Sequence, residues 1–580
     1  MSGNSTDQFF KSTVLGHPSG LFVLFFTEMW ERFSYYGMRA LLVLFLTASL
    51  LDEGWGWPRE HAMALFGSYV GLVYLSTMMG GYFADKVIGF RWAVVVGALL
   101  MTLGHASMAA ETEWSIYLGL VLLVFGNGFF KPNMTSIISE MYKDRPEKKD
   151  GAYTIFYMGV NAGAFLGILL CGYLGEKVGW SLGFGLAGIF MFFGLIQFWL
   201  AQNIFGDIGL KPIKNDANSI EALDNDKRVP FTSWQLGLIL LMVLLGLVWI
   251  INAPATTITN GRINLFSFLG ENGNNMAIST ALGLFLVLLV YRFTQYSKIT
   301  REKLIAVSFF ALLSIFFWAI FEQSPGTLTI FARDYTDRTL DGSSATVFRI
   351  VNSLMAIIPL GIITYVLFLL FKQTFGKYKW ANIILSLSFI IVWIIAIWML
   401  ADQFKDDNLE IPASWFSVLN SLFIITLAPL FSKWWESKYN PSANGKYGIG
   451  MLLLALGMAC VAFGAMGIEP GAKTASVSIM WLILVYLFHT MGELCISPVG
   501  LSYVSKLVPA RMIAFMFGVW YLAVAIGMKG AGVFGENIDK VANESGISYF
   551  FWVLTIISFI VAVFSFVMAP IIKKLMHGVR

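Results

Sequence analysis

The chain has 580 residues, of which 57% are hydrophobic and 13% charged, and its mean hydropathy is +0.72. A soluble domain carries about 25% charged residues, so about half of the usual charge is missing. This composition excludes a disordered chain, a nucleic-acid-binding protein and an ordinary soluble enzyme, and a net charge of +4 is too balanced to indicate a polyanionic partner. One membrane span with its connection takes about 35 residues, so the chain is long enough for about sixteen spans.

Apolar segments long enough to cross a bilayer recur along the whole chain, and each is expected to form one transmembrane helix. In chain order they cover residues 18–50, 61–84, 91–110, 114–138, 151–175, 181–203, 234–252, 276–296, 303–331, 345–371, 380–401, 413–435, 447–467, 476–506, 512–534 and 547–571. The polar stretch 204–233 is the only long linker, and it separates the first six segments from the others. This division is typical of transporters built from two halves with a substrate site between them.

Basic and acidic loops alternate between the predicted spans. If the N-terminus lies in the cytosol, the basic loops, such as 143–149 and 372–379, all fall on the cytosolic side, as the positive-inside rule requires. We therefore expect an even number of helices and two cytosolic termini. The first 17 residues lack the pattern of a cleavable signal peptide, so the first helix is expected to remain in the protein and to direct it to the cytoplasmic (inner) membrane. Three cysteines and five histidines form no metal-binding or disulfide pattern, and no cofactor is expected.

The first predicted helix carries a stripe of charge at membrane depth, where each ionisable side chain costs at least ~2.5–3.5 kcal/mol. At about 100° per residue these polar side chains gather on one side of the helix. They are Glu28, Glu31, Arg32 and Arg39, with Tyr35 and Tyr36 beside them. One interpretation is an ion-pair cluster that fixes helix packing. The other is a carboxylate whose proton competes with a nearby arginine, and we favour it because burying two carboxylates and two guanidinium groups is costly for architecture alone.

Three further charges lie inside apolar segments, and each has a structural and a functional interpretation. Lys131 precedes Pro132 at the end of a helix, where a lysine also snorkels to the membrane surface. Glu322 precedes Ser324-Pro325-Gly326, which weakens a helix, and it is alternatively an interfacial acid near the outer mouth. Glu493 shares a helix face with His489 and Ser497, which also fits a hydrogen-bonded packing ladder.

Four motifs around these charges resemble those of the proton-dependent oligopeptide transporter (POT, or PTR) family of the major facilitator superfamily. They are residues 28–37 (EMWERFSYYG), 125–133 (FGNGFFKPN), 317–323 (FWAIFEQ) and 492–501 (GELCISPVGL), in the order that the family has them. The glycine-flanked basic loop 80–89 also looks like the short loop typical of the superfamily. The resemblance implies an all-α, polytopic membrane protein with two six-helix bundles and a two-helix hairpin between them. The sixteen predicted segments exceed that number, so we expect extra transmembrane hairpins and about sixteen helices in total.

The resemblance also implies a function, which is proton-coupled import of di- and tripeptides by alternating access. Its expected proton-coupling residues are Glu28, Glu31, Arg32 and Glu322. The expected peptide-binding residues are Arg39 and Lys131 for the carboxylate, Glu493 for the amine, and Tyr35, Tyr36, Tyr74, Asn161, Trp318, Asn420, Ser497 and Trp520 around them. Asn161 and Asn420 lie in looser motifs, and helix packing is the alternative for both. In the expected cycle Glu322 pairs with Lys131 or Arg39 in one conformation and is freed by a proton or by the peptide carboxylate.

Other functions stay open at this point. Relatives in the family carry nitrate or other small solutes, so nitrate, amino acids and peptide-like compounds are the alternative cargo, whereas Glu493 favours a zwitterion. A channel is disfavoured by the two-halved sequence, and no catalytic constellation indicates an enzyme. The expected partners are small peptides, protons and the lipid bilayer, with no nucleic acid, and we expect the chain to act as a monomer.

The expected domain organisation has five parts. They are an N-terminal six-helix bundle (1–206), a linker with an inter-bundle hairpin (207–298), the first helix of the second bundle (299–340), an additional hairpin (341–402) and the remainder of the second bundle (403–580). The additional hairpin departs from the family pattern, and it is either a lipid-facing decoration or a regulatory element. The second-helix histidine of the animal members has no counterpart, since Gly67 occupies that position.

Overall fold

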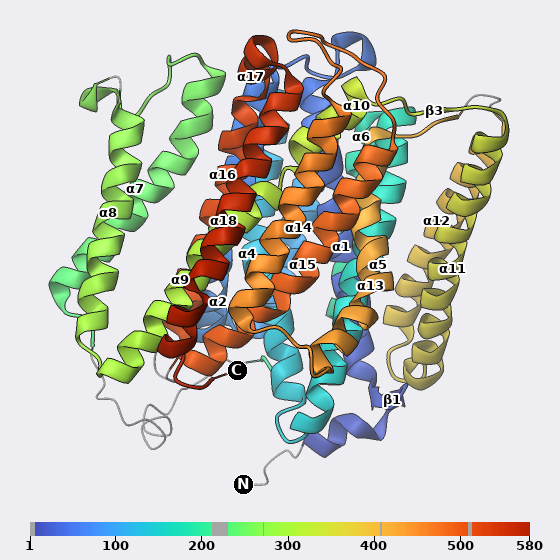
Figure 1. The fold of residues 1–580 in the computed structure, drawn as a ribbon. Helices are drawn as coiled ribbons and strands as arrows, with labels where there is room; N and C mark the ends of the chain where they lie inside the picture. Colours follow the sequence, from blue (N-terminus) through green and yellow to red (C-terminus); the bar gives the residue numbers. More distant parts are fainter. Residues whose placement is uncertain (1–5, 211–229, 271, 406–408, 509–512, 580) are drawn as a thin grey trace.

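The computed structural model describes residues 6–210, 230–270, 272–405, 409–508 and 513–579. These residues form a body of parallel and antiparallel helices whose long axes run in one general direction (Figure 1). Two pairs of two-residue strands, β1 (Thr13–Val14) with β2 (His17–Pro18) and β3 (Thr339–Leu340) with β4 (Leu409–Glu410), are antiparallel. The predicted all-α class is therefore confirmed.

The helices have the following bounds. In the first half of the chain they are α1 (Ser19–Thr47), α2 (Arg59–Phe83), α3 (Phe90–Met108), α4 (Glu113–Met141), α5 (Pro146–Lys177), α6 (Trp180–Ala201), α7 (Ser233–Ile258) and α8 (Gly273–Thr294). The second half contains α9 (Lys298–Phe321), α10 (Thr329–Tyr335), α11 (Gly342–Thr374), α12 (Lys379–Gln403), α13 (Val418–Glu436), α14 (Ala443–Gly464), α15 (Met480–Leu507), α16 (Ile513–Glu536), α17 (Ile538–Ser545) and α18 (Ile547–Leu575).

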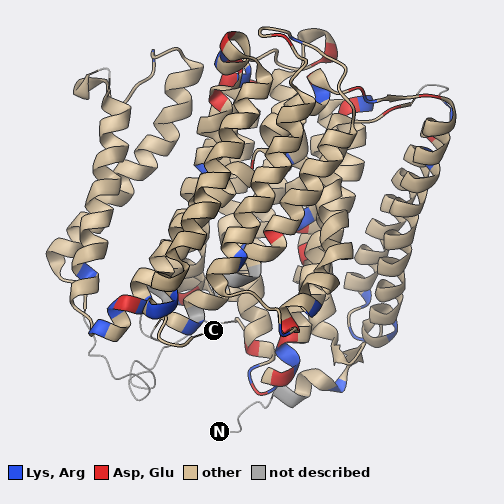
Figure 2. Cartoon of the chain, viewed as in Figure 1, with Lys and Arg blue, Asp and Glu red and all other residues tan. Residues whose placement is uncertain are grey.

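The number of long helices agrees with the sequence. Within the described ranges, 15 helical segments are long and apolar enough to cross a membrane, and α1 is the sixteenth long helix. Its charges, Glu28, Glu31, Arg32 and Arg39, set α1 apart from the others. The run predicted at 303–331 forms α9 and α10, which a helical turn at Ser324–Leu328 separates. Charged side chains concentrate at the two ends of the helices, and few lie between (Figure 2).

Close helix packing in the first half depends on small residues along α5. A Cβ atom on Gly163 would lie 2.1 Å from the backbone oxygen of Met29, and one on Gly167 would lie 2.2 Å from that of Phe33. Glycines spaced by four residues let two helix backbones approach each other in a membrane. Helix α1 consequently sits deep in the protein, against α5 and α6, and its charged residues are buried.

The two halves contact each other along two seams. Helix α2 of the first half packs on α16 of the second, and α5 packs on α13. At the first seam Gly67 faces Gly532, where a Cβ on either residue would lie 2.6 Å from the other's Cα. Two hairpins flank this body on opposite sides (Figure 1). Helices α7 and α8 contact α2 and α9, whereas α11 and α12 contact α1, α5 and α6.

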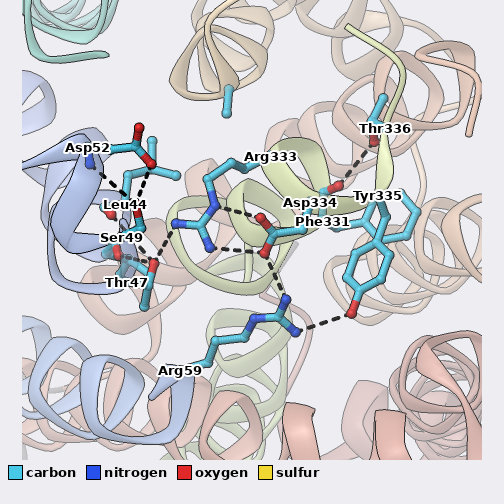
Figure 3. Close-up of polar contacts among 12 residues, drawn as sticks. Leu44, Thr47, Ser49, Asp52, Arg59, Phe331, Arg333, Asp334, Tyr335 and Thr336 are labelled. Carbon is cyan, nitrogen blue, oxygen red and sulfur yellow. Dashed lines mark hydrogen bonds and ion pairs between the residues drawn. The ribbon is translucent and has the colours of Figure 1, made fainter. Parts of the chain in front are cut away.

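A polar network joins the halves at the end of the molecule remote from the first described residues and from the end of α18 (Figures 1 and 3). Arg59, at the start of α2, donates to Asp334 of α10 at 2.8 Å, to Asp539 of α17 at 2.9 Å and to the hydroxyl of Tyr335 at 3.2 Å. Arg333 donates to Asp334 and also to Thr47, the last residue of α1, at 2.8 Å. We call these residues the Arg59 latch, because they hold α1 and α2 against α10 and α17.

The Arg59 latch predicts a conformational effect of Arg59→Gln. A hydrogen bond to a charged group contributes about 1.5–3 kcal/mol, so the loss of even one of these contacts should raise the population that is open at this end about tenfold or more. Spin labels at the exposed positions Glu60 and Lys540, in a cysteine-free background, report that opening by pulsed electron resonance. Lys405→Gln, which breaks a pair with Asp402 outside the latch, is the control and should leave the distances unchanged. Identical distance distributions for Arg59→Gln and the parent would contradict the role of the latch.

Candidate functional site

The charged stripe of α1 forms a compact, buried cluster. The Nε atom of Arg32 lies 2.9 Å from Glu28 Oε1 and 2.5 Å from Glu31 Oε2. Asn127 of α4 donates from Nδ2 to Glu31 Oε1 at 3.0 Å. At most 4% of each of the three charged residues is exposed. One guanidinium group therefore shares two carboxylates, and one of these carboxylates is also held by a neighbouring helix.

A second ion pair joins the two halves at membrane depth. Arg39 of α1 donates to Glu322, which is the first residue after α9. The break after α9 presents this carboxylate, and Gln323 secures the break because its side-chain amide donates to backbone oxygens of Ala319 and of Ala531 in α16. Of the two partners that the sequence leaves open for Glu322, the structure brings Arg39 into contact.

Lys131 lies close to both ion pairs without joining either. Its Nζ atom sits 4.5 Å from the ring centroid of Tyr74 on α2, a cation–π contact. Gly128, one turn earlier on α4, allows this approach because a Cβ there would lie 2.6 Å from the backbone oxygen of Ser76. Lys131 is within electrostatic range of Glu31 and of Glu322, yet no carboxylate of the described residues lies within ion-pair distance of it.

The second half contributes an acid and an amide. Asn420 of α13 donates to Glu493 Oε2 of α15 at 3.0 Å and to Thr490 at 3.1 Å. Glu493 is partly exposed and lies within electrostatic range of Glu322 and Arg39. The acid is thus brought near the Arg39–Glu322 pair by helices that are distant from α1 in the sequence.

Aromatic side chains surround these charges. The Arg39 guanidinium lies 5.9 Å from the ring centroid of Tyr35 and 5.6 Å from that of Tyr36. Tyr36 also lies within electrostatic range of Glu322 and Glu493, so it borders groups from both halves. Trp318 is partly buried and packs edge-on against Phe317 and Phe321, and Trp520 is buried over Gly500.

Two predicted residues make contacts that do not point to a ligand. The Asn161 side-chain amide donates at 2.9 Å to the backbone oxygen of Tyr157, within its own helix α5, which is a packing contact. The Ser497 hydroxyl is buried and has no hydrogen-bond partner among the described residues. Neither Asn161 nor Ser497 therefore contacts a charged group of the site among the described residues.

The sequence analysis missed several polar contacts of this region. Asn127 stands inside the fourth-helix motif, so its position next to Lys131 was a signal for it. Arg59 lies in a connection that also contains Asp52 and Glu53, and the structure gives it a partner on each of two second-half helices. Tyr486 carried no signal in the sequence, although its hydroxyl lies 3.2 Å from that of Ser417 and donates to the backbone oxygen of Ser324 at 3.3 Å.

Comparisons with known proteins identify the family of the chain. A protein-family model described as "POT family" matches residues 91–375 and 380–553 of the chain. The peptide transporter YePEPT of Yersinia enterocolitica is 32% identical over 534 residues, which cover 91% of this chain and 89% of that protein. A di-/tripeptide transporter of Lactococcus lactis is 29% identical and covers 98% of this chain and 99% of that protein.

A solved structure of a peptide transporter, described as POT in complex with sulfate, is 28% identical and covers 99% of this chain and 100% of that chain with a TM-score of 0.71. The predicted major facilitator fold is thereby confirmed. The family match extends over most of the chain and includes three of the four motifs named above. The chain is therefore a multi-pass membrane transporter that belongs to the POT family.

Proposed function

We propose that this transporter imports di- and tripeptides together with protons by alternating access. The observation that carries the proposal is the Arg39–Glu322 ion pair between the halves, beside a lysine that has no carboxylate partner among the described residues. A substrate carboxylate fits the free Lys131 and competes with Glu322 for Arg39. The names of the relatives, peptide and di-/tripeptide transporters, support a peptide as that substrate.

A short peptide has two fixed charges and variable side chains, and the site contains groups for each. Arg39 and Lys131 suit the carboxylate, while Glu493, oriented by Asn420, suits the amine. Arginine and carboxylate groups form strong, charge-assisted hydrogen bonds with such termini. Tyr35, Tyr36, Tyr74, Trp318 and Trp520 supply amphipathic surface, which accepts varied side chains. Asn161 and Ser497 belong to the proposed site as flanking polar groups.

Proton coupling follows from the requirement that buried charges stay paired. When the halves separate at Arg39, an ionised Glu322 is left without its cation, at a cost of several kcal/mol. Protonation of Glu322 removes this cost, and a peptide carboxylate then satisfies Arg39. The Glu28–Glu31–Arg32 cluster lies on the same helix, α1, and Asn127 links its Glu31 to α4, so a shift of α1 against α4 changes the surroundings of this carboxylate. We therefore assign Glu322 and this cluster to proton coupling.

Nitrate is the alternative cargo that the site favours less. Glu493 lies in electrostatic range of Glu322, so two carboxylates repel an anion that lacks an amine. A screen of thermal stability against di- and tripeptides, single amino acids and nitrate separates these ligands. Stabilisation by nitrate but by no peptide would overturn the proposed substrate.

The first test concerns Glu322→Gln in proteoliposomes with an inward proton gradient. We expect uphill dialanine uptake to be lost, because the amide cannot exchange a proton, whereas peptide counterflow without a gradient continues. Asp402→Asn removes a carboxylate at the end of α12 whose partners, Lys405 and Tyr173, are not residues of the proposed site, so it should leave both activities unchanged. Full uphill uptake by Glu322→Gln would reject its assignment to coupling.

The second test concerns Glu493→Gln. Loss of a charge-assisted contact of about 1.5–3 kcal/mol should raise the KM for dialanine about tenfold or more. N-acetyldialanine has no charged amine, so its weak inhibition of uptake should not change in this variant. Equal effects of the substitution on both compounds would show that Glu493 does not bind the amine.

We propose further that the protein lies in the cytoplasmic membrane as a monomer with both termini in the cytosol. The first described residues and the end of α18 lie at the same end of the molecule, which supports placing both termini on the same side of the membrane (Figure 1). A fluorescent protein at the C-terminus should be bright, and alkaline phosphatase at the same position inactive, if that end is cytosolic. Light scattering of the detergent-solubilised protein should give the mass of one chain, 64.6 kDa; a multiple of it would reject the monomer.

A further inference from the structure

The hairpin of α11 and α12 belongs to one half by sequence and contacts the other in space. It follows α10 and precedes α13, and the β3–β4 pair closes its base. However, α12 packs on α6 and α5, and α11 contacts α1 and β1 (Figure 1). The hairpin is therefore continuous in sequence with the second half but packs on three helices of the first half.

Polar contacts hold the hairpin together along its length. Near its base Asn352 donates to Gln403 at 3.0 Å, in the middle the Trp393 indole donates to Thr364 at 3.0 Å, and near the tip Asn382 donates to Thr374 at 3.0 Å. Buried hydrogen bonds between helices resist separation in an apolar environment. The hairpin thus presents α12 to the body as a stable surface.

One side chain of that surface reaches α1. Phe389 of α12 is 2% exposed, and its ring centroid lies 5.6 Å from that of Phe26 and 5.5 Å from that of Trp30. Trp30 also stacks on Phe190 of α6, with ring centroids 4.6 Å apart. Trp30 is fully buried, so α6 and α12 together enclose it. Edge-to-face and stacked ring contacts of this kind fix both distance and orientation.

Trp30 lies in the middle of the charged segment of α1, between Glu28 and Glu31. Glu31 also accepts the hydrogen bond of Asn127 at 3.0 Å, and because this bond crosses from α1 to α4, a small rotation of α1 changes its length and the distance from Glu31 to Lys131. The charged and titratable groups that face the two carboxylates are Arg32, Tyr35 and Tyr36 on α1, Lys131 on α4 and Tyr69 on α2, and Asn127 of α4 adds a hydrogen bond. The other side of the helix, which carries Trp30, is the side that the hairpin contacts.

We propose that Phe389 is a positioning residue for the Glu28–Glu31–Arg32 cluster and that the α11–α12 hairpin tunes proton coupling through it. Phe389 holds Trp30 against α6 and thereby fixes α1 relative to Asn127 and Lys131 of α4. The inference rests on the proposed proton-coupled uptake. It assigns the additional hairpin a role in transport and distinguishes it from a lipid-facing decoration.

The test measures dialanine uptake by the full-length protein in proteoliposomes as a function of external pH. In Phe389→Ala α1 is held less firmly against α4, and Glu31, when it moves away from Asn127 and Lys131, binds a proton more readily. We expect the pH of half-maximal uptake to move about half a unit or more toward alkaline values, which is about threefold in proton affinity. Counterflow without a proton gradient should be retained. Phe389→Leu keeps the apolar volume but lacks the ring contacts, so a smaller shift in the same direction is expected.

Trp398→Ala is the matched control. Trp398 lies on the same helix, and its ring contacts Tyr173 of α5 with centroids 6.0 Å apart, so its loss weakens hairpin docking away from α1. This variant should lower thermal stability without moving the pH profile. An unshifted profile in Phe389→Leu, or an equal shift in Trp398→Ala, would overturn the proposal. Absence of peptide uptake by the unmodified protein would instead reject the proposed function itself.

Discussion

The cost of leaving a charge unpaired in an apolar environment is the constraint on which the other features of this transporter depend. Arg32 shares Glu28 and Glu31 within one helix, so that group of charges stays satisfied whichever way the halves rotate. Arg39 and Glu322 belong to different halves, and their pair cannot survive a separation of α1 from the end of α9. In the proposed cycle a proton and a substrate carboxylate replace the lost partners, so this one pair would link both to the same movement.

The rest of the interface between the halves is arranged around that pair. At one end, the Arg59 latch joins α1 and α2 to α10 and α17. Below it, Gly67 and Gly532 bring the backbones of α2 and α16 together, and no side chain separates them. Individual polar contacts can break one at a time, and the Gly67–Gly532 contact has no large side chains that interlock. Both features permit the halves to rotate, whereas interlocked large side chains would resist rotation. The described conformation is therefore held at the latch end by bonds that can be broken singly.

The two hairpins add a different kind of constraint. Both lie outside the two six-helix bundles, but α11 and α12 emerge from the second half and pack on the first. The contact of Phe389 with Trp30 extends this attachment to the helix that carries the charged cluster. The α11–α12 hairpin consequently contacts the helix of the proposed coupling site on the side away from its charges. The contact consists of apolar packing between Phe389 and Trp30 and involves no charged side chain of the hairpin.

The sequence by itself determined the sixteen long helices, because hydrophobic length is a local property of the chain, and it located the charges at membrane depth for the same reason. It did not determine which charges meet. Glu322 contacts Arg39 and leaves Lys131 without a carboxylate partner among the described residues, Asn161 turns to its own helix, and Arg59 finds Asp334 and Asp539. Each of these outcomes depends on how helices far apart in the chain cross and rotate, which the glycine contacts of α5, α2 and α16 set. The docking of α12 on α1 and α6 was decided in the same way, since periodicity reports that a helix has an apolar face but not which neighbour covers it.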